Sequence, residues 1–146
     1  MAVTDPDPRA ARADVELRLP ADGAYVSVLR TTTAGLAARL DFTIDDIEDL
    51  RIAVGEACAL VLPEADLGSS LEARFYLAPA ELTISVGVVA SSAATPDYDS
   101  FAWQVLTTLA SSATVDAAAG RFAVTMTMRS ALAGLDSRAG DLGTDD

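Results

Sequence analysis

The stretch from Ile44 to Pro63 limits the possible folds most, because its pattern predicts one long helix inside a core. Thr43 is a good N-cap, and acidic residues fill the first turn, where the helix dipole favours negative charge. Pro63 sets the end, since the residue before a proline is pushed out of helical geometry. Apolar residues at helical spacing predict a buried face made of Ile47, Leu50, Val54, Ala57, Cys58 and Val61.

The other side of this helix is also apolar. At about 100° per residue, the residues opposite the buried face are Ile52, Ala53, Ala59 and Leu60. We therefore expect this helix to be covered on both sides or to border a pocket. Glu56 is the one charge in its later turns, and a carboxylate there costs free energy unless it is paired, protonated or wet. Glu56 is a candidate catalytic residue, and the alternative is an acid that reaches solvent or pairs with an arginine.

Two residue types are absent, and their absence excludes whole classes of chemistry. The chain has no histidine, which excludes Ser-His-Asp and Cys-His catalysis and histidine-ligated zinc. It also has no lysine, which excludes a P-loop and a Schiff-base enzyme. Any chemistry must therefore use carboxylates, hydroxyls, arginines, backbone groups or a bound ion.

The net charge of −12 bears on the partners of this protein. Such a charge repels phosphate backbones and anionic lipids, so we expect no direct binding to nucleic acid or to a membrane. An acidic surface suits a basic protein partner, although it can also serve solubility alone.

Length and composition predict the domain organisation. We expect a flexible tail over residues 1–13, one domain over 14–132 and a disordered acidic tail over 133–146. No run approaches the ~20 apolar residues of a membrane span, and the start has no apolar signal region. The single cysteine excludes an internal disulfide, so we predict a cytoplasmic protein.

Seven elements are predicted, in the order strand, helix, helix, strand, strand, helix, strand. They cover residues 15–19, 22–40, 44–62, 71–77, 82–88, a helix from 101, and 122–128. The two middle strands form a hairpin, in which Gly87 indicates a bulge or a close backbone approach. This order predicts an α+β two-layer sandwich, with a mixed, mostly antiparallel sheet and about three helices on one face.

Two further helix faces follow from apolar spacing. The face predicted for residues 22–40 contains Tyr25, Val28, Leu29, Leu36, Ala37 and Leu40. The stripe predicted for the third helix contains Val105, Leu106, Leu109 and Ala113. Trp103 is expected in the core, with an exposed anchor as the alternative.

Three segments resemble the small bacterial anti-sigma factor/serine-protein kinase family. They are LRLPADGAYVSVLRTTTAGLAARL, IEDLRIAVGEACALVL and FAWQVLTTLASSATV, and LRIAVGEA is the most specific part. The resemblance runs from about Val15 to Arg129 in matching element order. It implies the Bergerat ATP-binding fold, also found in histidine kinases, and a homodimer.

The resemblance also assigns candidate nucleotide-binding positions. Glu56 matches the family's glutamate that polarises the attacking nucleophile, whereas Leu60 stands where an asparagine holds magnesium. The family's Asp-x-Gly-x-Gly segment corresponds to VGVVASSAATP here, and Ser91 and Asp97 are the candidate substitutes. Ala102 is the near match to the family's phosphate-binding Gly-x-Gly-Leu turn. We therefore expect no cofactor and no metal, with ATP and magnesium possible only if this degenerate site still binds.

The resemblance implies a regulator that sequesters an RNA polymerase sigma factor and is relieved by an anti-anti-sigma antagonist. Arg30, on the first helix, is the candidate partner contact, and the alternative is a solvated arginine. The alternative function is an ATP-dependent protein serine kinase that acts on the antagonist through Glu56. A third possibility is a structural partner protein without either activity.

Overall fold

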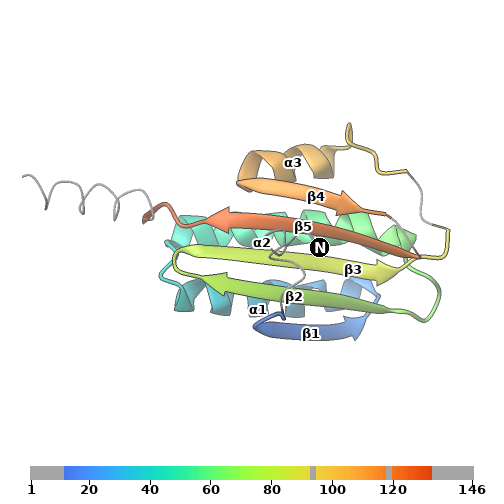
Figure 1. Ribbon diagram of the computed structural model, residues 1–146, viewed down its shortest axis with the longest axis horizontal. Coiled ribbons are helices and arrows are strands. Elements are labelled where there is room, and N and C mark those ends of the chain that lie inside the picture. Colours follow the sequence, from blue (N-terminus) through green and yellow to red (C-terminus); the bar gives the residue numbers. More distant parts are fainter. Residues whose placement is uncertain (1–11, 93–94, 118–119, 133–146) are drawn as a thin grey trace, which may run out of the picture.

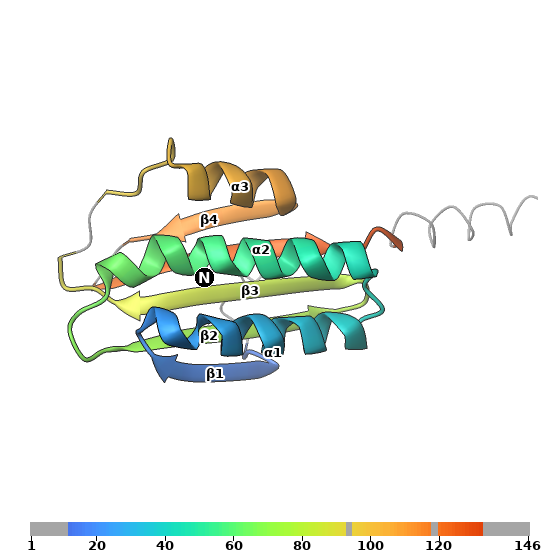
Figure 2. The same ribbon diagram turned by 180° about the vertical axis from the view of Figure 1, so that it is seen from behind.

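A five-stranded sheet carries three helices on one of its faces (Figures 1 and 2). The computed structural model describes residues 12–92, 95–117 and 120–132. In chain order the elements are β1 (Val15–Pro20), α1 (Val26–Arg39), α2 (Ile44–Val61), β2 (Ser70–Ala78), β3 (Glu81–Val89), α3 (Phe101–Leu109), β4 (Ser112–Asp116) and β5 (Arg121–Arg129). The predicted tail over 133–146 and most of the tail over 1–13 lie outside the described residues.

The strand order is β1-β2-β3-β5-β4, and each of the four neighbouring pairs is antiparallel. This arrangement confirms the predicted two-layer α+β fold, and the predicted hairpin is β2–β3. Its strands are joined by Pro79 and Ala80, and Ala80 has a φ of 57°. Figure 1 shows the sheet in front, with β1 and β4 at its two edges.

Strand β4 is absent from the predicted elements, and the helical placement of Ala113 was wrong. Helix α3 ends at Leu109, and Ala113 lies in β4 opposite Met126. The cause is the composition of β4, in which only Ala113 and Val115 turn inward while polar residues alternate with them. Five residues with two small apolar side chains give too weak a period to distinguish a strand from the end of a helix.

The core lies between the helices and one face of the sheet. The largest fully buried side chains are Phe75, Leu29, Leu50, Leu71, Leu82, Ile84, Leu106 and Met126. On the central strands every second residue is buried, as the pleat requires. Trp103 is partly buried and packs against this core, as expected.

The buried face of α1 differs from the predicted one. Leu29, Thr33 and Ala37 are fully buried, whereas Tyr25 is 39% and Val28 is 42% exposed. The reason is that Leu29, Thr33 and Ala37 align at intervals of four residues, and Val28 stands about 100° away. Tyr25 belongs to a 3-10 turn before the helix begins.

Helix α2 begins with a capping box between Thr43 and Asp46, each side chain accepting from the other's backbone N–H. The predicted buried face is confirmed, but its predicted opposite side is not covered. Ile52 is 49% exposed and Ala59 is also exposed, while Ala53 is fully buried in the core. The buried part of the α2 surface is therefore wider than one stripe, because α2 lies between α1 and α3 (Figure 2).

The outer face of the sheet is polar and internally bonded. Thr83 Oγ1 lies 2.9 Å from Thr127 Oγ1, and the Arg121 guanidinium lies 3.6 Å from Glu72. Gly87 confirms the predicted close approach, because a Cβ there would overlap Arg121 Nη2 and lie 3.0 Å from Ala123 Cβ. The pairing of β3 with both neighbours is continuous through Gly87, so the alternative of a bulge was wrong.

Candidate functional site

The candidate catalytic residue, Glu56, lies in the second half of α2. It is partly exposed, and no hydrogen bond or ion pair joins its side chain to another residue in the part of the chain that the structure describes. Leu60, one turn further on, packs against the core and offers only carbon atoms. The described residues contain no group of three or more Cys, Asp or Glu side chains that could hold a metal ion.

Ser91 is held by Asp66 immediately after β3. The Ser91 backbone N–H donates to Asp66 Oδ1 at 2.9 Å, and the Ser91 hydroxyl donates to Asp66 Oδ2 at 2.5 Å. These two hydrogen bonds, the hydroxyl's above all, lower the pKa of Asp66. The Asp66 backbone N–H donates to the Val89 carbonyl, so this loop is fixed to the end of β3. Both donors of Ser91 are therefore engaged within the protein.

The amino end of α3 is capped by its own chain. Ser100 is the N-cap, and its Oγ accepts from the Trp103 backbone N–H at 3.2 Å. Just before it, Asp97 Oδ1 accepts from the Asp99 backbone N–H at 3.0 Å. Ala102 lies in the first turn and is partly buried. The helix terminus that should meet a phosphate group thus has one of its free donors satisfied by Ser100.

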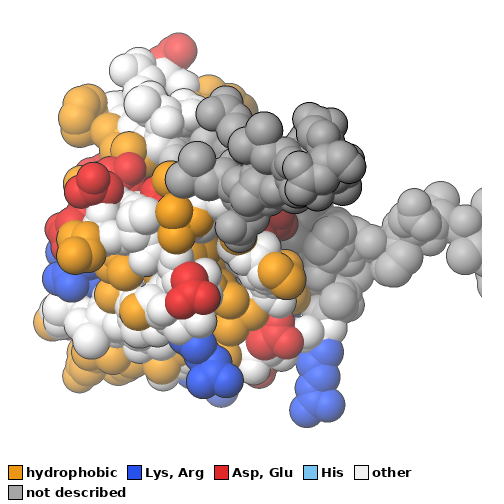
Figure 3. Space-filling model, turned by 90° about the vertical axis from the view of Figure 1, so that its left-hand side faces the viewer, with side chains coloured by type: hydrophobic (Ala, Val, Ile, Leu, Met, Phe, Trp, Pro, Cys, Tyr) orange, Lys and Arg blue, Asp and Glu red, His pale blue; other side chains and the backbone are white. Residues whose placement is uncertain are grey.

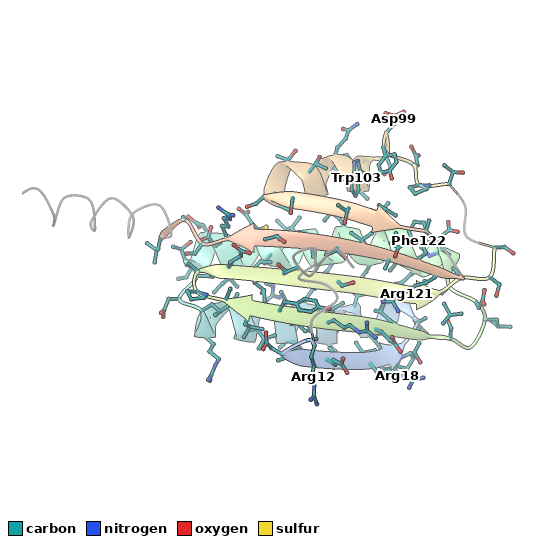
Figure 4. All side chains as sticks on the ribbon, in the orientation of Figure 1. Arg12, Arg18, Asp99, Trp103, Arg121 and Phe122 are labelled. Carbon is teal, nitrogen blue, oxygen red and sulfur yellow. The ribbon has the colours of Figure 1, made fainter. Side chains whose placement is uncertain are left out.

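The structure places three of the candidate positions between the end of β3 and the first turn of α3. They are Ser91, Asp97 and Ala102, and no hydrogen bond joins any of them to Glu56 among the described residues. Figure 4 shows Asp99 and Trp103 at the α3 end of the molecule.

These side chains do not fit magnesium-ATP. The position expected to hold the metal is a leucine, the donors of Ser91 are turned to Asp66, and α3 is capped by Ser100.

Arg30 lies at the crossing of α1 and α2. A Cβ added at Gly55 would overlap Arg30 Nη2 and lie 3.1 Å from Arg30 Cζ, so the guanidinium rests directly on the Gly55 backbone. Burial raises the pKa of the Cys58 thiol to about 11, and the positive charge of Arg30 acts in the opposite direction. Arg30 itself is exposed, and no ion pair is found for it within the described residues.

Sequence reasoning identified Arg30 but missed Gly55 and Asp66. A glycine inside a helix costs about 1 kcal/mol relative to alanine, so Gly55 within LRIAVGEA was a signal that a neighbour approaches closely. No comparable signal marks Asp66, because its partner lies 25 residues away and across a hairpin.

No family model matches the chain, but curated proteins do. A serine-protein kinase RsbW of Halalkalibacterium halodurans is 45% identical over 64 residues, which is 43% of this chain and 40% of that protein. A serine-protein kinase RsbW of Bacillus velezensis is 47% identical over 51 residues, which is 35% of this chain and 32% of that protein. The chain therefore spans less than half the length of these curated relatives.

A solved structure is similar to this chain in fold. It contains the RsbU and RsbW domains of a Mycobacterium tuberculosis protein, and it matches with a TM-score of 0.64 over 80% of this chain and 31% of that chain. The sequences are 18% identical, so this likeness concerns the fold alone. The curated matches confirm the predicted resemblance: over the matched segment this chain is similar to the serine-protein kinases RsbW.

Proposed function

We propose that this domain is an anti-sigma-type regulator, which sequesters an RNA polymerase sigma factor and releases it when an antagonist protein binds. We also propose that it acts as a homodimer in the cytoplasm. The observation that carries the proposal is the similarity to the RsbW proteins, combined with a nucleotide region whose polar groups are engaged elsewhere. Binding without phosphoryl transfer is the function that this combination supports best.

The helix layer offers a surface for such a partner. Arg30 is exposed on α1 and has no carboxylate partner among the described residues, so its charge is available to an acidic group. Tyr25, in the 3-10 turn before α1, and Val28, in its first turn, are each about 40% exposed. Arginine and aromatic side chains are both enriched among the residues that dominate the energies of interfaces. The net charge of −12 also supports a protein partner over nucleic acid.

The test is capture of partners from native lysate, followed by their identification by mass spectrometry. We expect a sigma factor to be recovered with the wild-type protein and to be lost or reduced with Arg30→Ala. Arg39→Ala is the matched control, because Arg39 is an exposed arginine in the last turn of the same helix. If no sigma factor is captured, the proposal is wrong. If both variants capture it equally well, Arg30 is not in the interface.

The second candidate is a protein serine kinase, and the names of the curated relatives favour it. Glu56 would polarise the attacking hydroxyl, and ATP with magnesium would have to bind through residues other than those described above. Incubation of the purified protein with labelled ATP and the antagonist tests this candidate. Phosphate transfer that is lost in Glu56→Gln would place the kinase ahead of the binding protein.

A further inference from the structure

The segment from Asp97 to Trp103 carries three aromatic side chains, of which Tyr98 and Phe101 are exposed while Trp103 packs partly against the core. Phe101, the first residue of α3, is 75% exposed, and Tyr98 is 54% exposed. The rings of Tyr98 and Trp103 meet edge to face, with their centroids 5.2 Å apart and an angle of 71° between their planes. The exposed rings of Tyr98 and Phe101, with Trp103 against Tyr98, lie close together in the sequence at the start of α3, and we call them the aromatic surface.

Two carboxylates border the aromatic surface. Asp97 and Asp99 are both exposed, and within the described residues the Asp97 carboxylate accepts only from the Asp99 backbone N–H. Figure 4 shows Asp99 at the α3 end of the molecule and Arg12 and Arg18 near the opposite edge, at β1. Figure 3 views a different end of the domain, the left-hand side of Figure 1, where hydrophobic, acidic and basic side chains are all exposed. The aromatic surface therefore combines apolar area with negative charge.

This combination determines which ligand chemistry fits. An anion is repelled by the two carboxylates, and the α3 terminus offers it little because Ser100 already accepts from the Trp103 N–H. A cation gains from the carboxylates and from the faces of the Tyr98 and Trp103 rings. An apolar side chain can cover Phe101, and aromatic residues of this kind dominate the energetics of interfaces. One ligand that satisfies both requirements is a helix with apolar residues on one face and lysine or arginine beside them.

We propose that the aromatic surface, with Asp97 and Asp99 at its border, docks a cationic amphipathic segment of a partner protein. This site is separate from Arg30, which carries the opposite charge on α1. The proposal does not depend on the identity of the partner suggested above, since it concerns the chemistry of the segment that is bound.

The test uses a synthetic helical peptide of leucine and lysine, with leucine at intervals of three and four residues. A matched peptide has glutamate in place of every lysine. Trp103 is the only tryptophan of the chain, so its fluorescence reports on the aromatic surface directly. We expect a saturable change in emission with the lysine peptide and none with the glutamate peptide. No saturable change with the lysine peptide, or an equal change with both peptides, overturns the proposal.

Two variants separate the aromatic surface from exposed apolar area in general. Phe101→Ser should weaken binding of the lysine peptide at least tenfold, and Leu67→Ser should not change it. Leu67 is the matched control because its side chain is also highly exposed, but lies in the loop before β2. Tyr98→Ser provides a second test of the same surface if Phe101→Ser does not fold. Undiminished binding in the variants of the aromatic surface overturns the proposal.

Two further variants separate local charge from the total charge of the protein. The double variant Asp97→Asn, Asp99→Asn removes two charges at the aromatic surface, and Asp45→Asn, Glu48→Gln removes two exposed charges from α2. We expect the first to weaken binding severalfold more than the second. Equal weakening by both double variants means that the peptide follows net charge alone, which overturns the proposal.

Discussion

Gly55→Ala is expected to stabilise the protein while it weakens partner binding, and this opposition makes it a sharp test. Alanine is better than glycine inside a helix by about 0.5–1 kcal/mol. The new methyl group would overlap Arg30 Nη2, which is the far end of a flexible side chain and can move at little cost. The free energy of unfolding should therefore rise by up to about 1 kcal/mol. For a chain of this size we expect an increase in the melting temperature of roughly 2–4 °C.

Displacement of the Arg30 guanidinium should lower the affinity for the partner. An interfacial arginine that acts as a hot spot contributes about 2 kcal/mol, and losing that amount corresponds to roughly a 30-fold weaker complex. The assay is thermal melting of each variant, together with a titration against the sigma factor that the capture experiment identifies. Gly35→Ala is the matched control, because Gly35 lies in α1 with no atom within 4 Å of its added Cβ. This control should gain stability and keep full affinity.

A double-mutant cycle completes the test. If Gly55→Ala acts by moving Arg30, it should add nothing to the loss caused by Arg30→Ala. A fall of several degrees in the melting temperature of Gly55→Ala would show that the guanidinium cannot move aside. If Gly55→Ala keeps full affinity while Arg30→Ala clearly loses it, contact with the Gly55 backbone does not position Arg30.

The remaining predictions concern the nucleotide region and the sheet. Glu56→Ala should change the free energy of unfolding by less than about 0.5 kcal/mol, because no described partner is left without its bond, and a large drop in melting temperature would instead assign Glu56 a structural role. Calorimetry with ATP and magnesium should give no saturable binding, and low micromolar binding would contradict our assessment of the site. The pKa of the Asp66 carboxyl should lie below the usual aspartate value of about 3.9 and should return towards it in Ser91→Ala. The contribution of this hydrogen bond to stability is therefore present above the usual pKa and is lost as the pH falls through the lowered one. An NMR titration that is unchanged in Ser91→Ala would contradict this prediction. Gly87→Ala should destabilise the fold by about 1–3 kcal/mol in chemical denaturation, because its Cβ would crowd Ala123 on the neighbouring strand, and unchanged stability would show that β5 can yield.

The parts of the fold that the sequence predicts are those with strong local patterns. The cap at Thr43, the long helix that follows it and the β2–β3 hairpin are all encoded within a few turns or strand residues. Strand β4 is the counterexample, because its five residues are defined by pairing with β5 and not by their own composition. The exposure of Tyr25 was also missed, since a 3-10 turn before α1 changes the spacing by which helix faces are predicted.

The candidate site is less accessible from sequence, for a related reason. Resemblance marks Glu56 and Ser91, but whether a polar group is free to bind a ligand depends on contacts with distant residues. The Ser91 hydroxyl donates to the carboxylate of Asp66, and the Arg30 guanidinium contacts the backbone of Gly55 on another helix. Neither pairing has a period or a motif. The site residues therefore remain predictions until the experiments above test them.

The placement of β4 and α3 has a consequence for how this fold can change over evolution. Both lie on an excursion of the chain between β3 and β5, and the Ala90 N–H donates to the Gly120 carbonyl where its ends meet. Strand β3 pairs with β2 on one side and with β5 on the other, and neither pairing involves residues of the excursion. Doubling the length of a loop costs only about 0.6 kcal/mol of closure entropy, so insertions in the loop before α3 are tolerated far better than substitutions of Leu106, which α3 buries in the core. A lineage could thus exchange one ligand for another within residues 90–120 while its scaffold stayed under unchanged selection for stability.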